Sequence, residues 1–256
     1  MQFEAPILSA ENVSRVFHLE GEEIHAVRNV TLQVPRGMFI ALVGRSGSGK
    51  TSLLNLLSGI DRPTSGTVTF EGRDLATFTE RDMVELRRHR MGFVFQSFGL
   101  LPLLSAYENV ELPLRIASVG ARERSQRTDD VLDMVGLRRR AHHRPYELSG
   151  GEQQRIAIAR AVAMRPSLIL ADEPTGELDS ANAHAIFSLF QQMVVDRDMS
   201  IVATTHDQTL LNMADRVFRL HDGAITATWS GAAYSSDPDE LFRPPERRGT
   251  HAAPRR

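Results

Sequence analysis

Apolar and polar positions along this chain follow two alternating patterns. Short runs of β-branched and aromatic residues, bounded by glycine, proline or charged residues, predict strands, and longer segments with apolar side chains every three or four positions predict helices. The predicted strands are NVSRVF, AVRNVTLQV, MFIALV, TVTFEG, MGFVFQ (ending at Gln96), LILA, SIVATT and DRVFRLHDG. The predicted helices are TSLLNLLSG, TERDMVELRRHR, SAYENVELPLRIA, RERSQRTDDVLDMV, RIAIARAVA and SANAHAIFSLFQQMVV. This alternation favours an α/β fold with a mostly parallel sheet.

Two segments break the alternation. From about residue 97 to residue 165 the β pattern disappears and helical patterns follow one another, so we expect a helical subdomain inserted into the α/β core. Beyond residue 229, Pro, Arg, Ser and Asp replace most apolar residues, which is typical of a disordered tail. The expected organisation is one domain over residues 1–229 and a tail over residues 230–256.

The composition narrows the class of protein. Among 256 residues the charged fraction is 24% and the formal net charge is −2, which provides no basic field for nucleic acid. The absence of cysteine excludes a disulfide framework and a thiolate metal site. The N-terminus lacks the pattern of a signal peptide, and apolar runs such as FIALV are far shorter than the roughly 20 residues that span a bilayer. We expect no direct membrane span, so a membrane role would need a partner protein.

The octapeptide GRSGSGKT at residues 44–51 follows a predicted strand and opens a predicted helix, as a phosphate-binding loop does. Its glycines allow backbone N–H groups to curl around a phosphate at the positive end of a helix. Lys50 would reach the β- and γ-phosphates of a nucleotide, and the Thr51 hydroxyl would bind Mg²⁺. Lys50 is the only lysine in the chain, and a flat guanidinium would replace its compact ammonium poorly. The candidate nucleotide-binding residues here are Gly44, Arg45, Ser46, Gly47, Ser48, Gly49, Lys50, Thr51 and Ser52.

Two further predicted strands end in reactive side chains. LILA runs into Asp172 and Glu173, where an aspartate can hold Mg²⁺ and a neighbouring glutamate can activate a water molecule. IVATT runs into His206. In open parallel sheets the ligand lies beyond the carboxyl ends of the strands, so Gly44, Asp172 and His206 should share one edge.

The segment LSGGEQQR predicts a second exposed helix N-terminus with small residues. Free N–H groups at such a terminus bind anions, and one chain with one nucleotide does not need two such sites. A head-to-tail dimer uses both, because each copy then caps the γ-phosphate held by the other. The candidate residues for this contact with the partner's nucleotide are Leu148, Ser149, Gly150, Gly151 and Glu152.

Taken together, GRSGSGKT, FVFQ, LSGGEQQR, LILADE, GELD and TTHD resemble the motifs of the nucleotide-binding subunits of ATP-binding-cassette (ABC) transporters. The resemblance covers about residues 7–228. It implies an α/β fold, namely a P-loop NTPase core with a mostly parallel sheet and an antiparallel β subdomain, plus an inserted helical subdomain. It also implies ATP and Mg²⁺ as ligands and ATP hydrolysis coupled to transport as the activity.

The resemblance assigns roles to individual residues. Gln96 would sense Mg²⁺ and relay to the membrane partner, and Asp172 would be the Walker B aspartate. Glu173 would be the general base, and His206 the switch that contacts the γ-phosphate. Asp179 would lie in the loop that crosses the dimer interface. The implied Mg²⁺ ligands are Thr51, Gln96 and Asp172.

A few positions have two open roles or depart from the family pattern. Phe17 matches the aromatic residue that stacks on adenine, with a plain core role as the alternative. Arg45 replaces a small residue or proline, and Glu177 replaces the more usual asparagine. The apolar cluster at residues 98–103 is either subdomain core or part of a groove that receives the permease.

Within the family, the sequence is similar to the lipoprotein-release, macrolide-export and cell-division subgroup. That likeness implies a homodimeric ATPase on the cytoplasmic, inner face of the membrane, attached to a permease with a large extracytoplasmic domain. Two alternatives stay open. One is a regulatory ATPase that controls a cell-wall hydrolase through a permease-like partner. The other is a soluble, non-transport ABC ATPase, although such relatives usually carry two cassettes or a long coiled-coil insertion.

Overall fold

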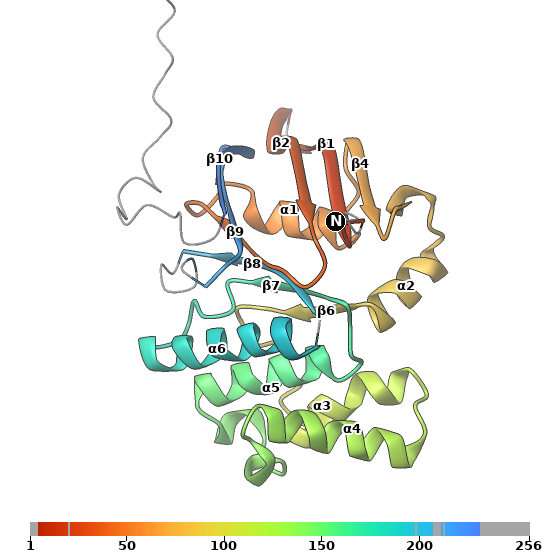
Figure 1. Cartoon of the computed structure of the whole chain (residues 1–256), viewed down its shortest axis with the longest axis vertical. Coiled ribbons are helices and arrows are strands. Elements are labelled where there is room, and N and C mark those ends of the chain that lie inside the picture. Colours follow the sequence, from red (N-terminus) through yellow and green to blue (C-terminus); the bar gives the residue numbers. More distant parts are fainter. Residues whose placement is uncertain (1–4, 20, 198, 207–210, 212, 231–256) are drawn as a thin grey trace, which may run out of the picture.

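The computed structural model describes residues 5–19, 21–197, 199–206, 211 and 213–230. The predicted tail beyond Ser230 lies outside the described residues. The described part of the chain builds two sheets with helices packed around them (Figure 1). None of its helices is long and apolar enough to cross a lipid bilayer.

A six-stranded sheet forms the centre of the molecule, in the order β10-β9-β3-β8-β7-β6. Its strands are β3 (Phe39–Val43), β6 (Met91–Val94), β7 (Leu168–Asp172), β8 (Ser200–Thr205), β9 (Arg216–His221) and β10 (Ala224–Ser230). All neighbouring pairs are parallel except β9 and β10. The mostly parallel sheet predicted from the strand and helix alternation is therefore confirmed.

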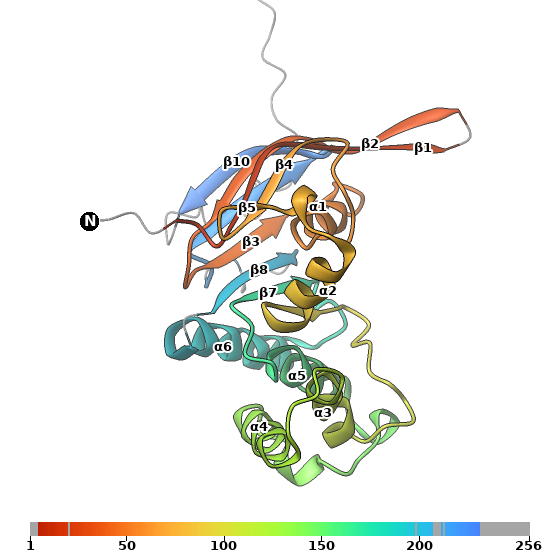
Figure 2. The ribbon, with the colours of Figure 1, turned by 90° about the vertical axis from the view of Figure 1, so that its right-hand side faces the viewer.

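A second sheet of four antiparallel strands lies beside the first, in the order β2-β1-β4-β5. It contains β1 (Leu8–Leu19), β2 (Glu22–Val34), β4 (Ser65–Phe70) and β5 (Arg73–Asp74). Figure 2 shows the β1–β2 hairpin extending away from the body of the molecule. This sheet is the antiparallel β subdomain that the family resemblance implies.

The central sheet separates two hydrophobic cores because successive side chains of a strand point to opposite faces. In β3, Ile40 and Leu42 face the antiparallel sheet and helix α1 (Lys50–Leu57). Phe39, Ala41 and Val43 face the other side, against α5 (Gly150–Val162) and α6 (Ser180–Arg197). Uninterrupted apolar runs such as FIALV are typical of strands buried on both faces.

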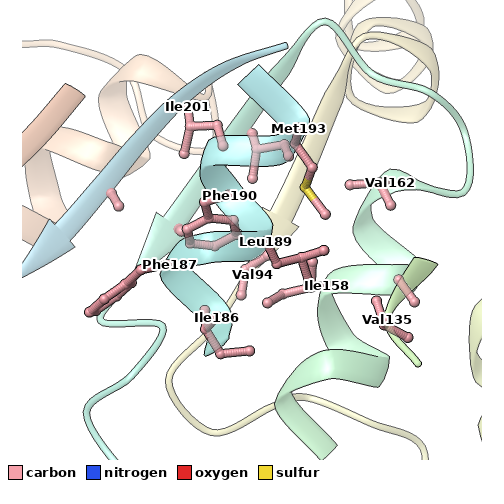
Figure 3. Close-up of a cluster of buried hydrophobic side chains, with 14 of the residues drawn as sticks. Val94, Val135, Ile158, Val162, Ile186, Phe187, Leu189, Phe190, Met193 and Ile201 are labelled. Atoms are coloured by element: carbon pink, nitrogen blue, oxygen red, sulfur yellow. The ribbon is translucent and has the colours of Figure 1, made fainter. Parts of the chain in front are cut away.

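Figure 3 shows part of the second core, where side chains from α5 and α6 meet beneath the sheet. Phe190 of α6 packs edge-to-face against Phe39 of β3, with ring centroids 6.2 Å apart. Two further helices, α3 (Ala106–Ile116) and α4 (Ala121–Met134), contribute Val110, Leu114 and Leu132 to the same core. In sequence these two helices and α5 lie between β6 and β7, where the helical patterns follow one another.

The remaining elements are α2 (Glu80–His89) and short 3₁₀ helices at Leu75–Thr77, Arg138–Arg140 and Pro145–Glu147. The structure differs from the prediction at three strands, since β6 is shorter than predicted and neither β5 nor β10 was predicted. The strand MGFVFQ ends at Val94, which pairs with Ala171, and not at Gln96, because Phe95 and Gln96 leave the sheet and are exposed to solvent. Strand β10 has no counterpart among the predicted strands, because most of its residues are small or polar and none is buried.

Candidate nucleotide-binding site

Three parallel strands deliver their carboxyl ends to one edge of the central sheet. Val43 at the end of β3 pairs with Thr205 of β8, and Asp172 at the end of β7 pairs with Thr204 of β8. The residues that follow these strand ends therefore emerge side by side. The structure thus brings the loop that starts at Gly44 together with Glu173 and His206, the arrangement that the strand ends predict.

The loop between β3 and α1 curls around the side chain of Lys50. The Lys50 Nζ atom donates to the backbone oxygens of Gly44 at 2.9 Å and of Arg45 at 3.3 Å, and the residue is only 6% exposed. A Cβ atom at Gly44 would lie 2.5 Å from the Leu220 oxygen. A Cβ at Gly49, where φ is 98°, would lie 2.2 Å from the Ala26 oxygen. Side chains at these two glycines would push the loop off the sheet, so the loop requires glycine there.

The start of α1 has properties that suit an anion. Gly49 precedes the first turn, no side chain caps its N–H groups, and the first turn holds no acidic residue. The Ser48 hydroxyl is buried without a hydrogen-bond partner. Unpaired N–H groups at a helix N-terminus carry partial positive charge and bind phosphate. A loop with an orphaned hydroxyl and a bare helix start fits the phosphate groups of a nucleotide.

A threonine that was not among the predicted site residues organises the carboxylates beyond β7. The Thr204 hydroxyl donates to Asp172 Oδ1 at 2.6 Å and accepts from the Glu173 backbone N–H at 2.8 Å. Thr204 is fully buried, so these bonds hold both acidic residues in fixed positions. The only signal in the sequence is the pair of hydroxyl residues, Thr204 and Thr205, that ends β8 just before His206.

Glu173 lies between two cationic or potentially cationic groups. Its Oε1 atom is 3.5 Å from Lys50 Nζ, and its Oε2 atom is 3.3 Å from His206 Nδ1. Its backbone has φ of 43°, a left-handed conformation that is uncommon for residues other than glycine and recurs at functional sites. This turn aims the carboxylate back across the sheet edge toward the phosphate-binding loop. A carboxylate held there can accept a proton from a water molecule near a bound phosphate.

The same edge offers oxygen ligands that fit Mg²⁺. The Thr51 side chain lies in the first turn of α1, and the Asp172 carboxylate lies at the neighbouring strand end. Within the described residues, no group of three or more His, Cys, Asp or Glu side chains could hold a metal ion by itself. Mg²⁺ normally keeps several waters and binds one or two protein oxygens together with substrate phosphates, which matches this donor set.

Gln96 follows β6 and is exposed to solvent. Its amide lies against the segment after Glu173, since a Cβ atom at Gly176 would lie 3.3 Å from Gln96 Nε2. The preceding residue, Phe95, accepts a hydrogen bond of 3.5 Å through its backbone oxygen from Gln154 Nε2 of α5. Gln154 is fully buried and was not predicted as part of the site. The segment around Gln96 therefore contacts both the catalytic edge and helix α5.

The start of α5 is built differently from the start of α1. Ser149 Oγ accepts from the Glu152 N–H, and Glu152 Oε2 accepts from the Ser149 N–H at 2.9 Å, which forms a capping box. The hydrogen bond from the Ser149 backbone holds the pKa of Glu152 below its ordinary value. A Cβ atom at Gly151 would lie 2.3 Å from Asn182 Oδ1, and the Asn182 N–H and amide both donate to Asp179. The glycine thus lets α5 approach the loop that carries Asp179.

Within one chain, the N-termini of α1 and α5 lie apart from each other. Helices α1 and α5 contribute to the two cores on opposite faces of the central sheet, as Figures 1 and 2 also show. Both segments lie in the described part of the chain, and no hydrogen bond or ion pair links residues 148–152 to residues 44–52 there.

Phe17 lies on β1, partly exposed, and belongs to neither buried core. The guanidinium carbon of Arg15 lies 4.4 Å from the centre of its ring, and Arg15 in turn pairs with Asp61 at 2.8 Å. The plain core role is therefore not observed, and one face of the ring contacts Arg15. Adenine stacking on the ring remains a prediction.

Comparison with known proteins agrees with this geometry. The family model described as "ABC transporter" matches residues 27–176. The chain belongs to the ABC transporter family. It is 46% identical over 203 residues to the ABC transporter ATP-binding protein YtrE of Bacillus subtilis, which covers 79% of this chain and 88% of that protein. It is 44% identical over 220 residues to the lipoprotein-releasing system ATP-binding protein LolD 2 of Caulobacter vibrioides, covering 86% and 96%.

Solved structures of an ABC cassette share its fold. The dimeric structure of MJ0796, described as a bacterial ABC transporter cassette, superposes with a TM-score of 0.82 at 38% identity and covers 87% of this chain and 98% of that one. A second dimeric structure of MJ0796, in a post-hydrolysis state with ADP and phosphate, has a TM-score of 0.81. The present chain is therefore an ATP-binding, ATP-hydrolysing cassette of an ABC transporter, and the predicted family and fold class are confirmed.

Proposed function

We propose that this cassette binds Mg²⁺-ATP at the edge formed by Gly44–Ser52, Asp172 and Glu173, and hydrolyses it as a head-to-tail homodimer. The observation that carries the proposal is the position of the Glu173 carboxylate, 3.5 Å from Lys50 Nζ and 3.3 Å from His206 Nδ1. Glu173 acts as general base on the attacking water, and His206 contacts the γ-phosphate. Thr51, Gln96 and Asp172 would hold Mg²⁺, which would supply charge neutralisation at the phosphate oxygens.

The ion pair between Lys50 and Glu173 suggests how ATP binding readies the site. Without an anion in the loop, the ammonium has Glu173 as its anionic neighbour. The β- and γ-phosphates offer Lys50 a stronger anionic partner, so the Glu173 carboxylate is released to accept a proton from water. His206, 60% exposed, can follow the carboxylate toward the phosphate.

The second copy of the chain completes each site. The start of α5, at Ser149 and Gly150, is exposed or half-exposed and lies on the other face of the sheet from α1. In a two-fold dimer each α5 start caps the γ-phosphate held by the other copy, and Asp179 lies in the loop between the two sites. Two ATP molecules are then enclosed at one interface, in keeping with the dimeric structures of the related cassette.

A membrane permease docks on the side of the molecule that carries α2 and α3. A groove of about 600 Å³ lies there, and four large apolar side chains in it are 42–58% exposed. They are Ile60, Val84, Phe95 and Ile116. The cluster at residues 98–103 is divided, since Leu100 packs on the core whereas Leu103 is 81% exposed. Exposed apolar grooves of this size receive amphipathic helices of partner proteins.

The dimer drives a conformational change in that permease, for export, lipoprotein release or force transmission. The 44% identity to a lipoprotein-releasing ATP-binding protein supports this branch of the family and a permease with a large extracytoplasmic domain. The cassette would then lie on the cytoplasmic face of the membrane, attached through the permease.

Substitution Glu173→Gln tests the proposed chemistry. The variant should bind Mg²⁺-ATP, turn it over at least about a hundredfold more slowly, and accumulate as a dimer, because the amide cannot take the proton. Light scattering with and without ATP measures the dimer, and phosphate release measures turnover. Asp196→Asn, which removes an exposed carboxylate on α6, is the control and should turn over normally. Wild-type turnover in Glu173→Gln would show that Glu173 is not the base.

A further inference from the structure

The docking groove carries an unbalanced charge. Its lining residues all belong to the described part of the chain and include Arg87, Arg88 and Arg160, with no aspartate or glutamate among them. The apolar lining comes from α2, β6, α3 and α5, and from Ile60, Phe95 and Met164 outside these elements. A helix that binds in the groove therefore contacts an apolar surface that also carries positively charged arginine side chains.

The three arginines are satisfied to different degrees within the described residues. Arg88 pairs with Glu85 at 2.5 Å, so its charge is neutralised at the rim. Arg87 donates to the backbone oxygen of Gly59 at 3.1 Å and has no carboxylate within ion-pair distance among those residues. Arg160 likewise has none, and donates to the backbone oxygens of Gly99 at 2.6 Å and Phe98 at 3.1 Å.

Of Arg87 and Arg160, the two groove arginines without a carboxylate partner among the described residues, Arg160 has the greater need for an anion. Burial lowers the pKa of its guanidinium below the ordinary value, because the charge is held away from water without an anion beside it. A guanidinium has five N–H donors in a planar fork, and here each of its two terminal nitrogens makes one hydrogen bond to a neutral carbonyl. A carboxylate would bind the remaining donors as a charge-assisted pair, which is stronger than a bond to a neutral oxygen.

The carbonyls that Arg160 holds lie two and three residues after Gln96. Phe98 and Gly99 both have positive φ, at 57° and 59°, so this segment makes a tight turn against Arg160. The guanidinium is thus the point where α5, the groove and the Gln96 segment meet.

We propose that the permease helix that docks in this groove presents an aspartate or glutamate to Arg160. The inference rests on the proposed docking of a permease and names the chemistry of the contact. The carboxylate accepts hydrogen bonds from the unused N–H groups of Arg160. The other N–H groups of Arg160 continue to donate to the Phe98 and Gly99 carbonyls. Arg160 then connects the docked helix, through one side chain, to the segment that carries Gln96.

Cross-linking from the groove identifies the docked segment. The chain has no cysteine, so Ile116→Cys introduces a unique attachment point for a benzophenone label on the groove rim. The labelled full-length chain is assembled with its membrane partner and irradiated, and the cross-linked peptide is sequenced by mass spectrometry. Val195→Cys, 81% exposed on α6 and away from the groove, is the matched control. We expect a cytoplasmic helix of a membrane protein with an acidic residue within about one turn of the cross-link.

Charge reversal then tests the contact itself. Arg160→Glu should weaken co-purification with the membrane partner about tenfold or more, and replacing the partner's acidic residue by arginine should restore it. Arg160→Gln, which keeps hydrogen-bond donors, should fall between. Arg139→Glu, at an exposed position outside the groove, should have no effect. Circular dichroism checks that each variant is folded, and restoration by the reciprocal change is a result that a purely structural role of Arg160 would not produce.

The outcomes separate the two proposals. A cross-linked helix without an acidic residue, or a failure of the reciprocal change to restore binding, would overturn the assignment of Arg160 and leave permease docking intact. A complex that forms normally while the label on the Ile116→Cys variant yields no cross-link to a membrane protein would overturn the groove as the docking site. Unaltered ATP turnover in Glu173→Gln, measured separately, concerns only the proposed chemistry.

Discussion

Helices α1 and α5 both begin with an N-terminus of the kind that can bind an anion, but the first turn of α1 is uncapped and that of α5 is capped. At α1 no side chain caps the first turn, no acidic residue lies in it, and the loop wraps a buried ammonium. At α5 a serine and a glutamate cap each other, and the helix start is open to solvent. The first site is incomplete without a ligand, whereas the second is satisfied within its own chain.

This difference fits the proposed roles, in which α1 holds the ATP of its own chain and α5 contacts the ATP of a partner. An uncapped helix end with unpaired N–H groups gains stability when a phosphate arrives. In the proposed dimer, an incoming γ-phosphate would compete with the negatively charged Glu152 carboxylate for the Ser149 backbone N–H, while the Ser149 hydroxyl oxygen accepts from the Glu152 N–H. In the proposed dimer, the contact at α5 would therefore be weaker than the contact at α1.

The largest expected effect is at α1. Lys50→Arg keeps the positive charge, but the forked guanidinium does not fit inside a loop that contacts the ammonium at 2.9 Å. We expect ATP turnover to fall by a factor on the order of 10² or more, measured by phosphate release. Arg139→Lys, an exposed exchange of the same two residue types, is the control. Near-normal turnover in Lys50→Arg would show that the loop does not require an ammonium group at this position.

The packing beneath α5 comes next. Gly151→Ala places a Cβ atom 2.3 Å from Asn182 Oδ1, so α5 or the Asp179 loop must shift. We expect a loss of about 1–3 kcal/mol in the free energy of unfolding, measured in urea. The matched variant Gly150→Ala meets its nearest atoms at 3.7 Å and should change stability by less than about 0.5 kcal/mol. Equal losses in both variants would mean that Gly151 is not needed for the approach to Asn182.

Removing hydroxyls compares the two helix starts directly. Ser149→Ala deletes the α5 cap and should lower the free energy of unfolding by about 1 kcal/mol. Ser48→Ala, in the loop before α1, should lower it less, because its hydroxyl has no hydrogen-bond partner in the absence of nucleotide. Denaturant titrations without ATP measure both. A larger loss for Ser48→Ala would contradict the contrast between an open and a capped helix start.

The smallest expected effect concerns the charge at α5. Glu152→Gln removes a negative charge near the γ-phosphate of the partner's ATP and should tighten ATP-dependent dimerisation about two- to fivefold. Arg140, 3.4 Å from the carboxylate, keeps the effect small. Analytical ultracentrifugation of the Glu173→Gln background with and without Glu152→Gln measures it. Weaker dimerisation would mean that the carboxylate helps to hold the partner.

The same carboxylate gives a pH dependence. The pKa of Glu152 is lowered in the folded chain, chiefly by the Ser149 backbone N–H. Its contribution to stability is therefore complete above the pKa of the unfolded chain, about 4.3, and is lost as the pH falls through the lower folded value. Relative to Glu152→Gln, the wild type should lose stability on acidification in that window, which denaturant titrations over pH can follow. Parallel curves would show that the cap does not depend on the charge.

The local features of the site could be predicted because they are written in consecutive residues. The octapeptide GRSGSGKT contains the glycines, the lysine and the threonine of one loop. The apolar runs that precede Gly44, Asp172 and His206 place each of these residues at the end of a strand. Parallel strands then force these ends to one edge. Capping at α5 follows similarly from a serine and a glutamate three residues apart.

The missed features depend on residues that are far apart in sequence. Thr204 and Asp172 are 32 positions apart, and Arg160 and Gly99 are 61 apart. No periodicity relates such pairs, because the distance between them depends on how strands and helices pack. Strand β10 was missed for a related reason. Its residues are mostly small or polar and none is buried, so the strand is stabilised by pairing with β9 and carries little hydrophobic signal of its own.

The sequence by itself determined the family, the α/β class, and the edge of the sheet where ATP chemistry takes place, because short motifs and strand periodicity encode them locally. Only the tertiary structure decided that Glu173 lies between Lys50 and His206, that Gly151 rests on Asn182, and that Arg160 reaches the segment after Gln96. Those relations arise when two cores pack on opposite faces of one sheet and bring side chains from distant elements within a few ångströms.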